Sequence, residues 1–117
     1  MSGARAHRTG LAAEESVLRA YRARGYALRE HRWRGAGGEV DLILERDGGL
    51  VFVEVKAARD FARAAESLSP RQMGRIAAAA GEYLGRMPQG QATQMRFDVA
   101  LVDRQGQVEL LEGAFGV

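Results

Sequence analysis

Two apolar segments joined by Asp47-Gly48 are the most restrictive feature of this 117-residue sequence. An Asp-Gly pair between apolar runs favours a two-residue hairpin turn, because both residues tolerate the left-handed backbone that such a turn requires. If these two residues form the loop, Arg46 pairs with Gly49 and the register of both strands follows. We therefore expect an antiparallel hairpin at the centre of the fold.

Acidic residues interrupt both strands at positions where a buried strand would be apolar. The same register places Asp41 opposite Glu54 and Glu39 opposite Lys56, with opposed Cβ atoms about 5 Å apart on one face. A shift of one residue would put Asp41 and Glu54 on opposite faces, so the prediction depends on the parity of the loop. Facing carboxylates form a hard-oxygen site that suits Mg²⁺ or Mn²⁺, and a neighbouring lysine can hold a water. The pattern indicates metal-assisted phosphodiester hydrolysis.

Charge is distributed unevenly around this acidic centre. Residues 1–34 carry eight Arg against three Glu, whereas residues 35–56 carry five acids against two bases. A basic arm beside a small acidic pocket suits a ligand with a phosphate backbone, although a solvated helix face explains the arginines equally well. Lys56 is the only lysine among seventeen basic residues. A lone lysine inside a strand suggests a chemical role, with retention by chance as the alternative.

Composition restricts the class of protein. A chain of this length, with 46% hydrophobic and 27% charged residues, is typical of one soluble globular domain spanning residues 1–117. We expect no membrane association, because no apolar run approaches the roughly 20 residues that cross a bilayer. Without cysteine there are no disulfides or thiolate metal sites, and the expected location is the cytoplasm.

A first helix is predicted from Thr9 or Gly10 to just before Gly25. Glu14 falls at the centre of its apolar face, where a carboxylate is unfavourable to bury unless it is paired or bound to a cation. The alternative is a rotated helix that leaves Glu14 at a wet rim. The apolar face itself consists of Leu11, Leu18 and Tyr21.

Candidate nucleic-acid contacts lie on either side of the hairpin. A strand is predicted over residues 26–33, and Arg32, Trp33 and Arg34 lead from it into a glycine-rich loop, where they could stack on a base or bind a phosphate. More often such a tryptophan covers the edge of the core. Arg71 and Arg75 lie on one face of a second helix and could meet phosphate, although solvation is the commoner outcome.

That second helix has strong boundary signals. Ser69-Pro70 provides an N-cap and a first-turn proline, Gln72 completes a capping box, and Gly85 ends the helix. Residues 57–67 before it are expected to form a mobile loop or an irregular helical turn. Two further strands are predicted over residues 96–102 and 108–111. The order is helix, three strands, helix, two strands, which implies an α/β fold with a mixed sheet flanked by helices.

Three segments, GEVDLI at residues 38–43, VFVEVK at 51–56 and RFDV at 96–99, closely resemble the bacterial YraN-like family, also called UPF0102. That family is related in fold to archaeal Holliday junction resolvases of the PD-(D/E)xK nuclease superfamily. The resemblance implies a restriction-endonuclease-like core. It also implies that Glu14, Asp41 and Glu54 bind the metal and that Lys56 is the catalytic lysine. Relatives usually have a lysine where this chain has Gln72, a difference that could alter substrate contacts.

Three functional hypotheses follow. The leading one is a Mg²⁺- or Mn²⁺-dependent endonuclease, or a resolvase-like enzyme, acting on linear or branched DNA. The Val55 carbonyl would help to bind the metal, Glu39 would support the ligands, and a homodimer is expected because resolvase relatives act as dimers. The second is a non-catalytic nucleic-acid-binding module on a nuclease fold. The third is a domain that binds a protein partner, in which Glu39 with Lys56 and Asp41 with an arginine form structural ion pairs.

Overall fold

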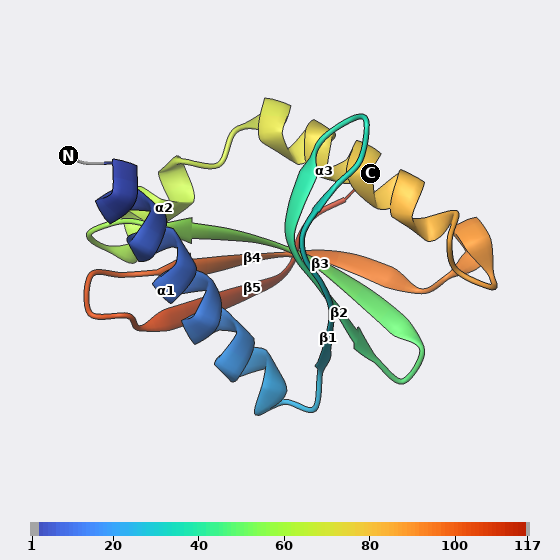
Figure 1. Cartoon of the computed structure of the whole chain (residues 1–117), viewed down its shortest axis with the longest axis horizontal. Coiled ribbons are helices and arrows are strands. Elements are labelled where there is room, and N and C mark those ends of the chain that lie inside the picture. The colour runs from blue at the N-terminus through green and yellow to red at the C-terminus, as the bar shows by residue number, and fades with distance from the viewer. Residues whose placement is uncertain (1–2, 117) are drawn as a thin grey trace.

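Residues 3–116 are described in the computed structural model, with side chains described from residue 10, and they form one five-stranded mixed sheet with helices on both faces (Figure 1). The sheet order is β1-β2-β3-β4-β5, and only β3 and β4 of these described strands are parallel neighbours. This confirms the predicted order, with α2 as an addition. The elements are α1 (Gly3–Arg22), β1 (Ala27–Arg34), β2 (Glu39–Arg46), β3 (Gly49–Ala57), α2 (Phe61–Glu66), α3 (Pro70–Leu84), η1 (Gly90–Ala92), β4 (Met95–Val102) and β5 (Val108–Phe115).

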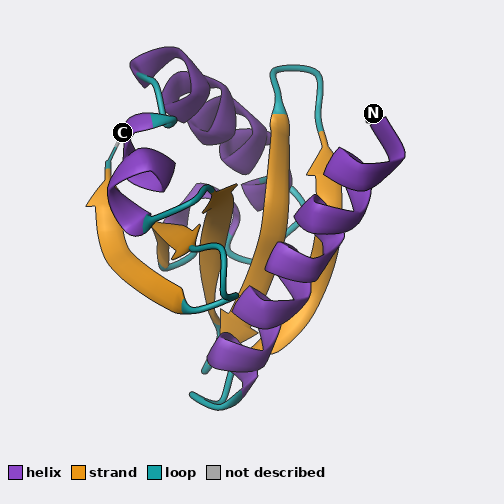
Figure 2. Cartoon of the chain, turned by 90° about the vertical axis from the view of Figure 1, so that its left-hand side faces the viewer, coloured by secondary structure: helices purple, strands orange, loops and turns teal. Residues whose placement is uncertain are grey.

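The parallel step from β3 to β4 determines where the helices lie. Parallel neighbours need a long crossover connection, and here the chain passes through α2 and α3 before it returns as β4. α3 covers one face of the sheet and α1 covers the other, as the two views show (Figures 1 and 2). Glu54 near the end of β3 and Gln72 near the beginning of α3 line one pocket, so these two ends lie close together.

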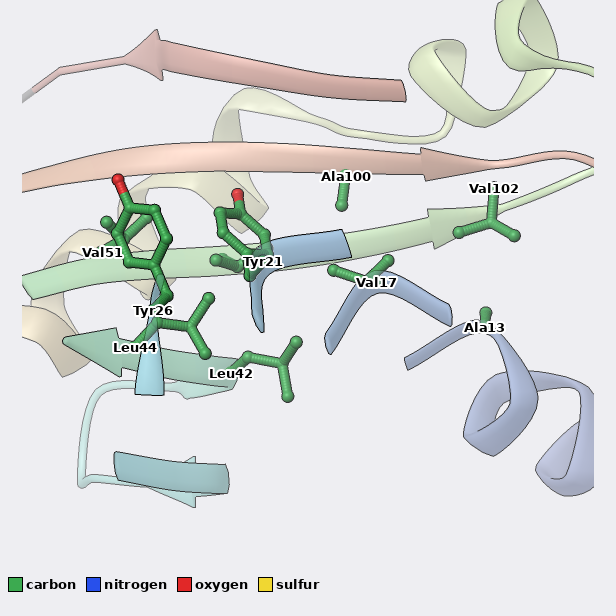
Figure 3. Packing of buried hydrophobic residues seen from close by; sticks show 10 residues of the cluster. Ala13, Val17, Tyr21, Tyr26, Leu42, Leu44, Val51, Ala100 and Val102 are labelled. Atoms are coloured by element: carbon green, nitrogen blue, oxygen red, sulfur yellow. The ribbon is translucent and has the colours of Figure 1, made fainter. Parts of the chain in front are cut away.

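Side-chain alternation along β2 builds a core on each face. Leu42 and Leu44 point toward α1, where they pack with Val17 and Tyr21 in the cluster of Figure 3. Ile43 points the other way and packs beneath α3. This period of two is the expected consequence of a strand whose two faces are both buried. The second cluster also includes Phe52, Ile76, Ala80, Tyr83 and Phe97.

The central hairpin has the predicted turn and register. Asp47 and Gly48 have φ values of 54° and 79°, and Arg46 is paired with Gly49. Ile43 is paired with Phe52, as the two-residue loop requires, so the parity of the loop is confirmed. The regular pairing ends at Leu42 and Val53, one step before the acidic residues.

The boundaries of α3 match their sequence signals. The Ser69 side chain accepts a hydrogen bond from the Gln72 N–H, and the Gln72 side chain accepts one from the Ser69 N–H, which completes the predicted capping box. Among the described residues, no helix is both long enough and apolar enough to cross a membrane.

Three boundaries differ from the predictions. α1 begins at Gly3, because a good capping residue such as Thr9 does not stop a helix whose preceding alanines and arginines also favour helix. The segment predicted as a mobile loop or an irregular helical turn contains the six-residue helix α2, which Asp60 caps by accepting the Arg63 N–H. β5 continues to Phe115 because Gly113, with φ of 59°, absorbs an irregularity in its pairing with β4.

Candidate active site

Asp41 and Glu54 meet where the hairpin opens, on the face that α3 covers. The Asp41 Oδ2 atom accepts a hydrogen bond of 2.8 Å from the Val55 N–H, so a side chain replaces the next backbone rung of the sheet. Lys56 lies two residues beyond Glu54 on the same face, and its Nζ atom is 3.3 Å from Glu54 Oε2. The side chains of Glu54 and Lys56 are only 12% and 15% exposed. The structure therefore brings together the two predicted carboxylates and the predicted lysine.

Both carboxyl groups are held in an environment that disfavours their charge. Burial, followed by the Asp41 carboxylate, raises the pKa of Glu54 from 4.5 to about 8, against the opposing effect of Lys56. Burial also raises the pKa of Asp41, and the hydrogen bond from the Val55 N–H opposes this rise because it stabilises the charged form. Asp41 therefore carries the charge of the pair, and Glu54 retains the proton to higher pH.

A pocket of about 190 Å³ opens beside this pair. One wall is the acidic end of the hairpin, and the other is the first two turns of α3. Arg75 thus brings a fixed positive charge to a pocket whose opposite wall is acidic. The lining residues are Glu39, Asp41, Glu54, Gln72, Arg75 and Ile76.

The pocket's donor set suits a hard divalent cation. Mg²⁺ typically engages one or two carboxylates, keeps several waters and takes its remaining ligands from a substrate phosphate. Asp41 and Glu54 supply two buried carboxyl groups, the Asp41 carboxylate disfavours the charge of Glu54, and Lys56 pairs with Glu54. Within the described side chains, however, no group of three or more His, Cys, Asp or Glu residues is arranged to hold a metal ion.

Glu14 is buried, but it is paired with other residues. The residue is 8% exposed, and its carboxylate accepts hydrogen bonds of 3.2 Å from both Nε and Nη2 of Arg32, with His31 Nε2 also in contact. The expectation of a paired carboxylate is confirmed, and the alternative of a wet rim is wrong. Glu14 lies near enough to raise the pKa of Asp41, while its assignment as a metal ligand stays a prediction.

Glu39 does not pair with Lys56. Its carboxylate instead accepts a 3.4 Å hydrogen bond from Arg34, and Lys56 pairs with Glu54 on its own strand. The expected Glu39–Lys56 contact fails because regular pairing stops at Leu42, so the opposed positions beyond it are no longer held together. The ion pair required by the third hypothesis is thus absent from the described part of the chain.

The predicted nucleic-acid contacts occupy different environments. Trp33 packs edge-on against Tyr83 with ring centroids 5.2 Å apart, and the guanidinium of Arg86 lies 5.1 Å from its ring. It therefore covers the edge of the core, as the alternative interpretation expected. Arg34 is 78% exposed at the end of β1. Arg71 and Arg75 are exposed on α3, and the structure leaves the DNA-binding role of all these residues a prediction.

Glu82 is a positioning residue that the sequence did not indicate. Its two carboxylate oxygens accept hydrogen bonds of 3.0 Å from the consecutive N–H groups of Ala36 and Gly37. The next residue, Gly38, packs so closely on α3 that a Cβ atom there would lie 2.5 Å from the Arg75 carbonyl oxygen. The glycine-rich loop is thus fastened to α3, which sets the spacing between the two walls of the pocket. A contact across 45 residues leaves no local signal in the sequence.

Asp98 anchors a second polar cluster on the α1 side of the sheet. Its carboxylate is fully buried and accepts hydrogen bonds from the Tyr21 hydroxyl at 2.7 Å, from Arg96 and from the Gly113 N–H. The acid within an apolar strand was the available signal, but its partners come from α1 and β5. Because this carboxylate has several donors, it functions as a structural junction.

Comparison with known proteins places this sequence in a family. Residues 13–102 match the family described as "Uncharacterised protein family UPF0102". A UPF0102 protein of Ruegeria pomeroyi is 60% identical over 97% of this chain and 93% of its own length. UPF0102 proteins of Roseobacter denitrificans and Cereibacter sphaeroides are each 50% identical, over 97% and 98% of this chain and 88% and 98% of their own lengths.

Proposed function

The chain belongs to the UPF0102 family, and we propose that it is a divalent-cation-dependent endonuclease of the PD-(D/E)xK type that hydrolyses phosphodiester bonds in DNA. One observation carries the proposal: Asp41 and Glu54 line a pocket whose other wall bears Arg75, and Lys56 pairs with Glu54. A buried acidic pair opposite a fixed cation matches the demands of phosphoryl chemistry, in which a metal and a phosphate share one site.

Each residue has a separate role in this proposal. Asp41 and Glu54, with the Val55 carbonyl, would hold Mg²⁺ or Mn²⁺, and Glu39 at the pocket wall would support them. The bound cation would polarise the phosphoryl oxygen and lower the pKa of a water. Lys56, whose ammonium group lies beside Glu54, would orient the attacking water and offset the phosphate's negative charge.

Exposed arginines around the pocket would guide the nucleic acid. Arg75 lines the pocket itself, Arg71 precedes it by one turn of α3, and Arg34 lies at the end of β1. Contacts of this kind position a phosphate backbone without reading its sequence. Trp33 packs at the edge of the core, and its role as a nucleic-acid contact stays a prediction. A two-fold DNA junction presents two scissile positions, so a resolvase-type activity would require a homodimer.

A cleavage screen tests the proposal. Wild-type protein is incubated with linear, flapped and four-way DNA in Mg²⁺, in Mn²⁺ and with a chelator. We expect cation-dependent cleavage of at least one substrate, with loss of activity in folded Asp41→Asn, Glu54→Gln and Lys56→Ala variants. Glu109→Gln, an exposed change on β5, provides the control. Full activity in the Asp41 and Glu54 variants would remove the metal-site assignment, and an inactive wild type would overturn the function.

A non-catalytic nucleic-acid-binding module is the second candidate. Two features favour it: Glu14 is engaged by Arg32, and no third metal-ligating residue joins Asp41 and Glu54 among the described side chains. It predicts DNA binding that weakens steeply with added salt, without cleavage under either cation. The same screen, run beside a binding titration at two salt concentrations, separates the two candidates.

A further inference from the structure

Arg32 is held in a backbone conformation that a strand residue rarely adopts. Its φ is 53°, and the other described non-glycine residue with positive φ, Asp47, belongs to a turn that requires it. Such a conformation is unfavourable by about 1–3 kcal/mol for a non-glycine residue, and it persists only where surrounding contacts impose it. Contacts that hold strain of this kind are frequent at functional sites.

The unusual conformation explains how neighbouring side chains reach one carboxylate. Consecutive residues of a regular strand point to opposite faces, yet His31 and Arg32 both contact Glu14. The guanidinium of Arg32 grips Glu14 with two parallel hydrogen bonds, Nε to Oε1 and Nη2 to Oε2, each 3.2 Å long. This fork-to-fork geometry is the one that arginine also forms with a phosphate.

Arg32 also neighbours the acidic pair. His31 is paired with Leu42 and Trp33 with Val40, so Arg32 lies between these rungs, level with Asp41 of the adjacent strand. The Asp41 carboxylate lies near enough to Arg32 to raise the pKa of its guanidinium, and Glu14 lies near enough to raise the pKa of Asp41. Arg32 therefore interacts with Glu14 directly and with the acidic pair through Asp41.

The partners differ in their access to solvent. The Arg32 side chain is 35% exposed, whereas that of Glu14 is 10% exposed. A phosphate approaching from solvent can therefore reach the guanidinium. The Glu14 carboxylate is largely shielded from solvent, so once Arg32 leaves it, its charge is not compensated by ions in solution. Glu14 and Asp41 would lie next to one another as uncompensated negative charges once Arg32 was taken by a phosphate.

We propose that Arg32 couples nucleic-acid binding to cation binding by exchanging Glu14 for a backbone phosphate. Without nucleic acid, Arg32 neutralises Glu14 and leaves Asp41 and Glu54 as the acidic pair. With nucleic acid, the phosphate takes the guanidinium, and the freed charge of Glu14 adds to the field of that pair. The affinity for a divalent cation then rises, and by reciprocity the cation strengthens the binding of nucleic acid. This inference rests on the proposed metal site, and it adds the order in which the site becomes complete.

Calorimetric titration of Ca²⁺, with and without a short duplex DNA, tests the coupling. Ca²⁺ is a hard cation for oxygen ligands, and a gel run afterwards checks that the DNA is intact. In the wild type, we expect DNA to raise the Ca²⁺ association constant by roughly 5- to 150-fold, the usual range for coupled sites. Arg32→Gln should raise the Ca²⁺ affinity measured without DNA and reduce the effect of DNA. If Arg32 only contacted phosphate, its replacement would leave the Ca²⁺ affinity measured without DNA unchanged.

Matched variants make the result specific. Arg29→Gln removes another arginine–glutamate pair of β1 that does not line the pocket, and it should keep the wild-type values. Glu14→Gln should lower the DNA-free Ca²⁺ affinity, because it leaves the Arg32 charge uncompensated near Asp41. A second change of Arg32 to Gln should restore that affinity without restoring the effect of DNA. If Arg32→Gln does not fold, Arg32→Lys, which retains the charge but loses the fork, should show an intermediate effect.

The outcomes separate this inference from the proposed function. If Ca²⁺ binds through Asp41 but Arg32→Gln leaves the DNA-free affinity unchanged or lower, the coupling is wrong and the metal site stands. If the wild type binds no Ca²⁺ with or without DNA, both the metal site and the coupling are refuted.

Discussion

Replacement of Glu54 by glutamine should stabilise the protein at neutral and alkaline pH, although it removes a predicted catalytic residue. Burial and the Asp41 carboxylate raise the pKa of Glu54 to about 8 in the folded chain, whereas the unfolded chain ionises near 4.5. Between these values the folded state binds more protons than the unfolded state. The stability contributed by Glu54 is therefore complete below about pH 4.5 and is lost as the pH rises to about 8.

The magnitude follows from the same two pKa values. At about 1.4 kcal/mol for each pH unit, the difference between 4.5 and about 8 corresponds to at most roughly 5 kcal/mol. Glutamine cannot ionise, so it escapes this penalty, but it gives up the ion pair with Lys56. We therefore expect the free energy of unfolding of Glu54→Gln, relative to that of the wild type, to rise by about 1–3 kcal/mol as the pH increases from 5 to 9.

Guanidinium unfolding at pH 5, 7 and 9 measures this difference, with the exposed Glu109→Gln as a control whose stability should follow the wild type. Mg²⁺ or Mn²⁺ should then stabilise the wild type and reduce the advantage of the variant, because a ligand that binds only the folded state stabilises it. A Glu54→Gln variant whose stability relative to wild type is independent of pH would refute the electrostatic reasoning. A cation effect of equal size in both proteins would argue against Glu54 as a ligand.

Further predictions concern the scaffold around the site. Asp98→Asn should lower the free energy of unfolding by about 3–5 kcal/mol, because an amide cannot satisfy all the buried donors that now meet the carboxylate; denaturant unfolding beside Glu109→Gln checks this. Gly38→Ala should destabilise the protein by about 1–3 kcal/mol, since its Cβ would collide with the Arg75 carbonyl. Gly74 lies on α3 beside Arg75, and a Cβ atom there would meet open space. Gly74→Ala should therefore stabilise the protein by about 0.4–1 kcal/mol. Equal melting temperatures for the two alanine variants would show that the loop does not pack on α3 as described.

The local features of this protein were predictable because the interactions that specify them span only a few residues. Asp47-Gly48 sets the turn, and the turn sets the parity that carries Asp41 and Glu54 to one face. Ser69 and Gln72 likewise define the start of α3 through two hydrogen bonds within one helical turn. The acidic pair, its lysine and the helix opposite them can therefore be predicted from the sequence.

Tertiary packing alone decided how each of these charges is satisfied. Regular β2–β3 pairing ends at Leu42, where the Asp41 side chain accepts the Val55 N–H, so the expected Glu39–Lys56 contact does not form. Glu14 shows the same limit, because the sequence indicates that a buried acid needs a partner but not that the partner is Arg32.

The physical reason is the range of the interactions. Turns and caps are decided by the backbone preferences of adjacent residues, and those preferences are present before the chain folds. The Glu82 clamp on Ala36, the Asp98 junction with Tyr21 and the Glu14–Arg32 pair join residues 46, 77 and 18 positions apart. Their geometry exists only after the sheet and both helices have packed. The sequence by itself thus determined which chemical groups are available, and the tertiary structure decided which of them are neutralised and which face the pocket.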